Sequence, residues 1–247
     1  MNNSSTEHNE TLDVIAVGAH PDDVEVACGG TLASLVRQGY RVGIVDLTDG
    51  EPTPNCPSPA VRIEESQQAA NALGVAKRIQ LDLPNRKLFD APEPRIALAK
   101  VFRLYRPKLV IGFGDKTPMA SPDHWQAMQI TDGAIFYSRL CKWDDPFDGL
   151  PPHTIDRHLY FRMALEPDSI PYLSHHITVD ITETLDAKIK SVACYQTQFA
   201  HRPGIIDRVR AAAIVTGSAA GVQYAESFAA AKPFAVQDLM KTVIDPV

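Results

Sequence analysis

The sequence of 247 residues has no apolar run near the length of about 20 residues that a membrane-spanning helix needs. Its first ten residues contain neither the basic stretch nor the apolar segment of a secretory signal. Blocks of lysine or arginine are also missing, and 24 basic against 30 acidic residues give a net charge of −6. These absences argue against a membrane protein and against a nucleic acid or an anionic membrane surface as the partner.

Cysteine is scarce as well. Cys28, Cys56, Cys141 and Cys194 lie far apart and form no Cys-x-x-Cys pair. This usage predicts a reducing, cytoplasmic setting. Cys28 lies in an apolar helical stretch and Cys194 in a second predicted helix, so we expect both to be small hydrophobic residues rather than nucleophiles.

Apolar and helical segments alternate along the first half of the chain. Short apolar runs predict strands over 12–18, 41–47, 78–83 and 108–113, and the spacing between them predicts helices over 24–39, 60–73, 93–105 and 123–140. With right-handed crossovers, this alternation predicts an α/β fold of the Rossmann-like, doubly wound type. Such a fold has a mostly parallel sheet with helices on both faces.

The pattern changes beyond residue 114. Residues 144–157 are rich in proline and aspartate, and the remaining chain predicts strands over 159–164 and 177–181 and helices over 182–197 and 205–220. Internal repeats, low-complexity tracts and linkers are not found in the sequence. We therefore predict a disordered tail over residues 1–10 and a single domain over residues 11–247.

A histidine and two carboxylates follow the first predicted strand, in the motif Ala19-His20-Pro21-Asp22-Asp23-Val24-Glu25. This is the carboxyl end of a central parallel strand, where open α/β sheets place their chemistry. His20 and Asp23 can face one point with Asp22 beside them, which indicates one metal ion and a neighbouring carboxylate base. Alternatively, Asp22 or Asp23 could cap the positive end of the following helix.

A hydrolytic metal site needs about three protein ligands and an open position. The segment Ser121-Pro122-Asp123-His124 follows the fourth predicted strand, so His124 is expected beside His20 as the third ligand. His124 could instead be an ordinary, partly exposed helix histidine. Asp123 is expected either to brace a histidine or to cap the helix.

Further motifs extend over nearly the whole chain from residue 12. They are Gly18-Ala19-His20-Pro21-Asp22-Asp23-Val24-Glu25, Gly29-Gly30-Thr31, Gly43 to Thr48, Arg62 with Glu65, Asn71 to Gly74, Tyr105-Arg106-Pro107, Pro122-Asp123-His124, Asp180-Ile181 with Lys188, Gly221, and Tyr224-Ala225-Glu226-Ser227-Phe228. In these residues the chain resembles the PIG-L/LmbE-like zinc-dependent N-acetylglucosaminide deacetylases. Within that family it most resembles the deacetylases of N-acetylglucosaminyl-malate in bacillithiol biosynthesis.

The resemblance implies that His20, Asp23 and His124 hold Zn²⁺, that Asp22 is the general base, and that Arg62 binds the anionic or sugar portion of the substrate. The reaction expected is removal of an N-acetyl group from an N-acetylglucosamine conjugate by metal-activated water. The resemblance also implies a homo-oligomer, a trimer or a hexamer. From the sequence alone, Arg62 could equally be a solvated helix residue paired with Glu65 or Ser66.

Two departures from the family pattern bear on rate and substrate rather than on metal binding. The second motif usually begins with a histidine that stabilises the oxyanion or protonates the leaving group, and here that position is Ser121. A tyrosine that some members carry near residue 205 has no aligned counterpart. Five histidines remain as substitutes, although each is more often a surface or satisfied histidine; they are His153, His158, His175, His176 and His201.

Three other functions compete with deacetylation. The same site could cleave thiol S-conjugates as an amidase, and the change at Ser121 would also suit a catalytically weakened relative with a binding or scaffold role. A nucleotide-binding module is disfavoured, because Gly29 and Gly30 fall inside the helix and no Gly-x-Gly-x-x-Gly turn follows the first strand. The aglycone, the physiological metal and the oligomeric state stay open.

Overall fold

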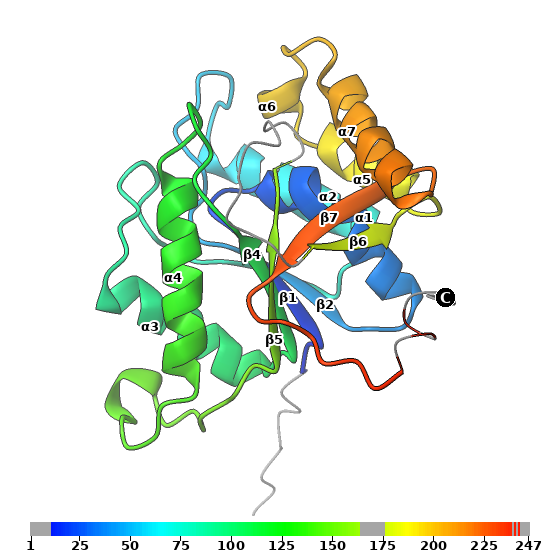
Figure 1. Cartoon of the computed structure of the whole chain (residues 1–247). Coiled ribbons are helices and arrows are strands. Elements are labelled where there is room, and N and C mark those ends of the chain that lie inside the picture. Colours follow the sequence, from blue (N-terminus) through cyan, green and yellow to red (C-terminus); the bar gives the residue numbers. More distant parts are fainter. Residues whose placement is uncertain (1–10, 164–175, 239, 241, 243–247) are drawn as a thin grey trace, which may run out of the picture.

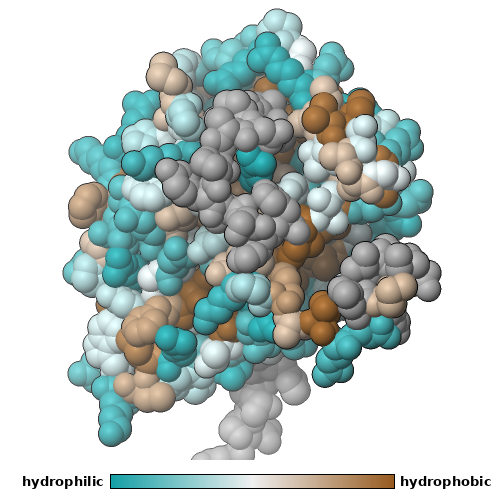
Figure 2. All heavy atoms as spheres, in the orientation of Figure 1, coloured by the Kyte–Doolittle hydropathy of each residue, from teal (hydrophilic) through white to brown (hydrophobic). Residues whose placement is uncertain are grey.

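The structure is a computed structural model that describes residues 11–163, 176–238, 240 and 242 (Figure 1). The tail predicted over residues 1–10 lies outside the described residues. No helix within the described ranges is both long and apolar enough to cross a bilayer. Hydrophilic residues cover much of the face in Figure 2, with hydrophobic residues in small groups between them, as on the outside of a folded domain.

Seven strands form one sheet in the order β3-β2-β1-β4-β5-β7-β6. Strands β1 to β5 pair in parallel, whereas β7 runs antiparallel to both β5 and β6. The mostly parallel sheet is therefore confirmed. The strands are β1 (Val14–Gly18), β2 (Val42–Asp46), β3 (Lys77–Gln80), β4 (Leu109–Phe113), β5 (Arg157–Phe161), β6 (His176–Asp180) and β7 (Ala225–Ala230).

Helices cover both faces of the sheet, which confirms the doubly wound arrangement (Figure 1). On one side lie α3 (Pro92–Tyr105) and α4 (Asp123–Ser138); on the other lie α1 (Asp23–Arg37), α2 (Pro59–Leu73), α5 (Leu185–Ala193) and α7 (Ile205–Ala220). All five residues of β1 are buried because helices pack on both of its faces. The order of the strands reverses between β1 and β4, and in such sheets ligands bind in the crevice at the carboxyl ends of the two strands that flank this point.

The second half of the chain departs from the predicted elements. The helix predicted over 182–197 is interrupted before α6 (Gln196–Phe199), because Tyr195 turns inward and donates a hydrogen bond to Glu25 at 2.9 Å. The strand β7 and the short helix η1 (Asp145–Phe147) are not among the elements that the sequence predicts. In β7, the residues Ala-Glu-Ser-Phe-Ala-Ala include few with a strong strand preference.

Helix α1 is kinked at Cys28, within the helix that the sequence predicts over 24–39. An ion pair between Lys188 and Glu226 provides partners for the backbone groups that the kink leaves free. The ammonium of Lys188 donates to carbonyls just before the kink, and Glu226 accepts from the N–H groups of Gly30 and Thr31 at 3.0 and 2.7 Å. The buried backbone groups at the kink therefore have hydrogen-bond partners, and the first half of α1 can run in a different direction from the second half.

Candidate metal centre and its cavity

Two histidines and an aspartate meet where the carboxyl ends of β1 and β4 lie side by side. The ligand atoms of His20, Asp23 and His124 all lie within 4.8 Å of one another. Asp23 Oδ1 is 3.3 Å from His124 Nε2, and Asp23 Oδ2 is 3.5 Å from His20 Nδ1. In the part of the chain that the structure describes, this is the one group of histidine, cysteine or carboxylate side chains placed to hold a metal ion.

The turn between β1 and α1 brings His20 and Asp23 together. Asp23 Oδ2 accepts the main-chain N–H groups of Ala19 and His20 at 3.0 and 2.8 Å, which closes the turn. Asp22 adopts a φ of 116°, a left-handed conformation that typically costs a non-glycine residue about 1–3 kcal/mol. Such strain persists where the surrounding contacts fix the backbone, and it is concentrated at functional sites.

The loop after β2 packs directly against this turn. Gly50 has a φ of +74°, and a Cβ atom there would lie 3.2 Å from Pro21 Cδ and 3.4 Å from His20 Cβ. A glycine therefore allows both the backbone conformation and the close approach. The loop after β2 therefore supports the position of His20, although it is not part of the motif that contains this histidine.

Each histidine ring has a partner on its outer side. Thr117 Oγ1 lies 2.7 Å from His124 Nδ1, and Phe113 stacks on the same ring with centroids 4.6 Å apart. Asp123 Oδ2 lies 3.4 Å from His20 Nε2 and accepts the main-chain N–H of Arg86 at 2.7 Å. Asp123 thus braces His20 from the first turn of α4. Partners of this kind orient the rings of metal-binding histidines.

The charges of the group favour a cation. Burial alone would lower the pKa of His20, but hydrogen bonds to Asp123 and Asp23 raise it to about 10. Burial would likewise raise the pKa of Asp23, but the charge of His124 and the hydrogen bonds to both histidines hold it well below its usual range. The site therefore stabilises positive charge at the ring nitrogens, carried by a proton or by a metal ion.

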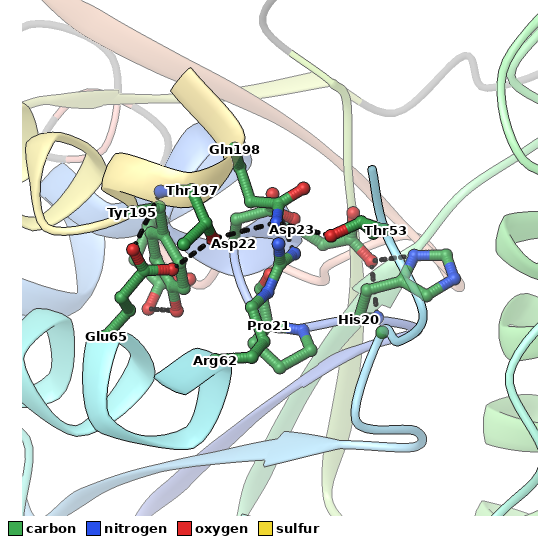
Figure 3. A network of polar contacts seen from close by, with 12 residues as sticks. His20, Pro21, Asp22, Asp23, Thr53, Arg62, Glu65, Tyr195, Thr197 and Gln198 are labelled. Atoms are coloured by element: carbon green, nitrogen blue, oxygen red, sulfur yellow. Dashed lines mark hydrogen bonds and ion pairs between the residues drawn. The ribbon is translucent and has the colours of Figure 1, made fainter. Parts of the chain in front are cut away.

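Asp22 lies beside this group and is paired with Arg62 (Figure 3). Arg62 Nη2 lies 3.0 Å from Asp22 Oδ2 and also donates to the carbonyl of Pro21. Desolvation raises the pKa of Asp22 to about 7, although the positive charge of Arg62 opposes the rise. Asp22 is the residue before α1, but its side chain makes no capping hydrogen bond to the helix.

The alternative of a solvated Arg62 is wrong. The residue is 2% exposed, and its Nε and Nη1 atoms are buried without a hydrogen-bond partner among the described residues. Glu65 and Ser66 are engaged elsewhere: Glu65 accepts the N–H and hydroxyl of Thr197 at 2.7 and 2.6 Å, and Ser66 donates to a carbonyl of its own helix. Figure 3 shows Glu65 and Arg62 pointing to different partners from one helix.

A cavity of about 370 Å³ opens above these residues. Of the predicted site residues, all except Asp123 line it. The cavity is lined by His20, Asp22, Asp23, Val26, Gly50, Thr53, Arg62, Asn85, Arg86, Ala120, Ser121, His124, Met163, Gln198, Phe199 and Arg202. Its size falls within the range of about 300–1,000 Å³ that is usual for small-molecule sites.

Ser121 lies in the loop before α4 and is half-buried at the cavity wall. Its hydroxyl oxygen accepts the N–H of Asp123 at 3.3 Å, and the hydroxyl proton stays available for another acceptor. The serine therefore stands at the wall where the family usually has a histidine.

None of the three described substitute histidine side chains lines the cavity. His153 bonds the carbonyl of Pro107 at 2.7 Å, and His201 contacts Asn55 at 3.1 Å. His158 lies 3.3 Å from Asp132, and burial lowers its pKa to about 4. His175 lies outside the described residues, and of His176 only the backbone in β6 is described.

Several polar residues of the site were missed by sequence reasoning. Thr117 and Arg86 lie in loops that follow β4 and β3. Their position after the end of a strand could have identified them as candidate site residues. Gln198 and Arg202 come from α6 and the loop after it, and no rule about strand ends points to them. Their place at the cavity depends on how α6 packs against α2.

We expect Thr117→Val to weaken the affinity of the site for a metal ion by about 10–100-fold, because His124 would lose the partner that orients its ring. Thr117→Ser keeps the hydroxyl and is the matched control, with an affinity near that of the wild type. The measurement is a zinc dissociation constant from competition with a chelating dye. Equal affinities for the valine and serine variants would show that the Thr117 contact does not support the ligand.

Comparison with known proteins links this site to a family. Residues 15–135, which contain the whole His20, Asp23 and His124 group, match the family described as PIG-L: GlcNAc-PI de-N-acetylase. The diacetylchitobiose deacetylase of Thermococcus kodakarensis is 28% identical over 230 residues, which cover 88% of this chain and 82% of that protein.

Two solved structures share the fold over most of their length. The conserved protein TT1542 from Thermus thermophilus has a TM-score of 0.78 and 31% identity, covering 92% of this chain and 97% of its own. The N,N'-diacetylchitobiose deacetylase from Pyrococcus horikoshii, in complex with its inhibitor MPG, has a TM-score of 0.76 and 26% identity, covering 88% and 82%. The chain therefore belongs to the PIG-L family of de-N-acetylases, as its motifs predict.

Proposed function

We propose that this protein is a zinc-dependent hydrolase that removes the N-acetyl group from an N-acetylglucosamine conjugate. The observation that supports this most is the meeting of His20, Asp23 and His124 with the carboxylate of Asp22 at one cavity. Two of the relatives named above are diacetylchitobiose deacetylases. N-acetylglucosaminyl-malate, the substrate of the bacillithiol pathway, is the specific conjugate we propose. A cytoplasmic location and a trimeric or hexameric homo-oligomer belong to the same proposal and rest on the family resemblance.

Zn²⁺ is the proposed metal because two imidazoles and one carboxylate, with room for a further ligand in the cavity, form a donor set that suits it. His20, Asp23 and His124 would hold the ion. The chemistry that such an ion supplies is polarisation of the amide carbonyl and a lower pKa for water. Thr117 and Asp123 would keep both histidine rings in position.

Asp22 is the proposed general base. Its carboxylate lines the cavity next to Asp23, and Arg62 at 3.0 Å holds it in one orientation. Asp22 would accept the proton of the attacking water as the new C–O bond forms at the amide carbon. The same carboxyl group would return that proton to the nitrogen as the C–N bond breaks, which releases acetate and a free amine.

Arg62 is proposed to bind the substrate as well as to hold Asp22. Its Nε and Nη1 atoms have no hydrogen-bond partner within the described residues, Nη1 lies 3.9 Å from the carboxylate of Glu51, and the residue lines the cavity. Substrate hydroxyl or carboxylate oxygens would satisfy these donors, which otherwise cost free energy when buried.

We expect Ser121→His to raise the rate of deacetylation about tenfold and Ser121→Ala to lower it only modestly. A serine hydroxyl can donate to the developing oxyanion, but a charge-assisted donor such as an imidazolium is about twice as strong. Acetate release and zinc content are measured for both variants, and zinc content should match the wild type. If Ser121→His abolishes turnover and Ser121→Ala is as damaging as loss of Asp22, the serine serves a different mechanism.

The experiment that tests the proposed function is an acetate-release assay with zinc-loaded protein. The substrates are N-acetylglucosaminyl-malate, diacetylchitobiose and a glucosaminide whose amine is acylated by an S-alkylated N-acetylcysteine; for this last substrate the free sugar amine is measured in place of acetate. We expect acetate and a free sugar amine from the malate conjugate. Cleavage of the S-conjugate instead would favour the amidase alternative. No turnover of any substrate, with zinc bound, would favour the binding or scaffold role.

A further inference from the structure

Two arginines at the cavity have no acidic partner among the described residues. Arg86 and Arg202 both line it, and across the described ranges no carboxylate lies within ion-pair distance of either guanidinium. The third arginine of the cavity, Arg62, is paired with Asp22. We propose that Arg86 and Arg202 form an anion-binding subsite that selects conjugates whose aglycone carries a carboxylate or a phosphate. This inference rests on the proposed deacetylase function.

Arg86 is held in place at its backbone and at its guanidinium. Its backbone has a φ of 64°, and its N–H is bonded to Asp123 at 2.7 Å. Its guanidinium donates to the carbonyl of Pro52, and the neighbouring Asn85 donates to the carbonyl of Glu51 at 3.0 Å. A guanidinium has several N–H donors, so most of them stay available to a ligand. Little side-chain entropy is then lost when an anion binds.

Arg202 follows α6, and the contacts of that helix fix where the residue stands. Its N–H bonds the carbonyl of Phe199 at 2.9 Å. Helix α6 is tied to α2 through Thr197 and to the loop after β2 through Gln198, whose amide donates to Thr53 Oγ1 at 3.0 Å (Figure 3). Arg202 therefore stands on an anchored element, while its own side chain is exposed and has no ion-pair partner in the described part of the chain.

The floor of the cavity, formed by the metal-binding group with Asp22 and Arg62, differs in charge from the rest of the lining. On the floor, Arg62 is paired with Asp22 at 3.0 Å and with Glu51 at 3.9 Å, and Asp23 contacts the two histidines. Arg86 and Arg202 add two positive charges to the lining and have no ion-pair partner among the described residues. Arginine binds carboxylate and phosphate in a two-pronged geometry, whereas neutral sugar hydroxyls need no such charge. The cavity is thus built for an acetamido group on its floor and an anion on its lining.

The test compares glycosides that differ only in the charge of the aglycone. Zinc-loaded protein is assayed on the methyl glycoside of N-acetylglucosamine, on N-acetylglucosaminyl-malate, and on N-acetylglucosamine 1-phosphate. Arg86→Gly is the first variant, because glycine keeps the left-handed backbone and the N–H that bonds Asp123. Arg202→Ala is the second. Each variant should lose about tenfold more kcat/KM on the better anionic substrate than on the methyl glycoside. Most of this loss should be a higher KM.

Two matched controls lie outside the cavity. Arg106 is exposed and left-handed with a φ of 54°, so Arg106→Gly reproduces the backbone change of the first variant. Arg208 is exposed on α7, so Arg208→Ala removes a comparable charge near Arg202. Neither control should change the preference between anionic and neutral glycosides. The preference of the wild type should shrink as salt rises, because the arginines are exposed.

A binding measurement tests the anion-binding subsite independently of deacetylase activity. Calorimetric dissociation constants of the two anionic glycosides are compared for wild type, Arg86→Gly and Arg202→Ala. We expect each variant to weaken binding about tenfold, and the tighter glycoside identifies carboxylate or phosphate as the anion. Unchanged dissociation constants in both variants would overturn the subsite, whatever the activity. Loss of binding in the variants with no acetate release by the wild type would overturn the deacetylase function alone.

Discussion

Replacement of Asp22 by asparagine should leave the metal bound and lower kcat by about 10²-fold or more. The amide has the shape of the carboxylate, and asparagine tolerates the left-handed backbone that Asp22 adopts at φ 116°. Only the proton acceptor and the ion pair with Arg62 are lost. The measurements are the rate of acetate release and the zinc content of the same preparation.

Asp115→Asn is the control for this variant. Asp115 lies in the loop after β4, at the same edge of the sheet, but it does not line the cavity. Its replacement should leave kcat within about twofold of the wild type, as is usual for a loop residue away from the chemistry. If Asp22→Asn deacetylates at nearly the wild-type rate with zinc bound, another residue is the base.

Removal of a metal ligand should lower the zinc content of the protein strongly. We expect about one zinc per chain in the wild type, and His124→Ala and Asp23→Ala should each lose most of it. His124→Ala removes one imidazole, whereas Asp23→Ala also removes the acceptor that closes the turn at His20. Elemental analysis after dialysis gives the zinc content, and circular dichroism reports whether each variant is folded.

His201→Ala is the matched control for the ligand variants. His201 is exposed, contacts Asn55, and does not line the cavity, so its loss should not change zinc content. Undiminished zinc in folded His124→Ala and Asp23→Ala would contradict the ligand assignment. Loss of zinc in all three variants would point to a less specific binding of the ion.

The first half of the fold could be predicted because β1, β2 and β4 are largely buried apolar runs, with helical segments between them. The second half lacks that contrast. The sequence of β7 is dominated by alanine and includes a buried glutamate, Glu226, whose partner Lys188 is distant in the chain. Such a strand is recognised only once its neighbours are known, since its packing rather than its own propensity makes it a strand.

The metal-binding group could be predicted for a topological reason. Parallel strands that are neighbours end at the same edge, so motifs after β1 and β4 had to meet. The environment of Arg62 could not be predicted, because the apolar positions of α2 give a weak pattern and do not reveal which side of the helix is buried. The contribution of Arg202 depends on the break before α6, where the buried Tyr195 donates a hydrogen bond to Glu25.

We propose deacetylation of an N-acetylglucosamine conjugate at the group formed by His20, Asp23 and His124. The most direct measurement is acetate release from N-acetylglucosaminyl-malate by protein stripped of metal and then titrated with Zn²⁺. We predict no release from the stripped protein, and a rate that rises with added zinc and levels off at about one ion per chain. Release at full rate by the stripped protein, or none by the zinc-loaded protein, would show that zinc-dependent deacetylation at this group is wrong.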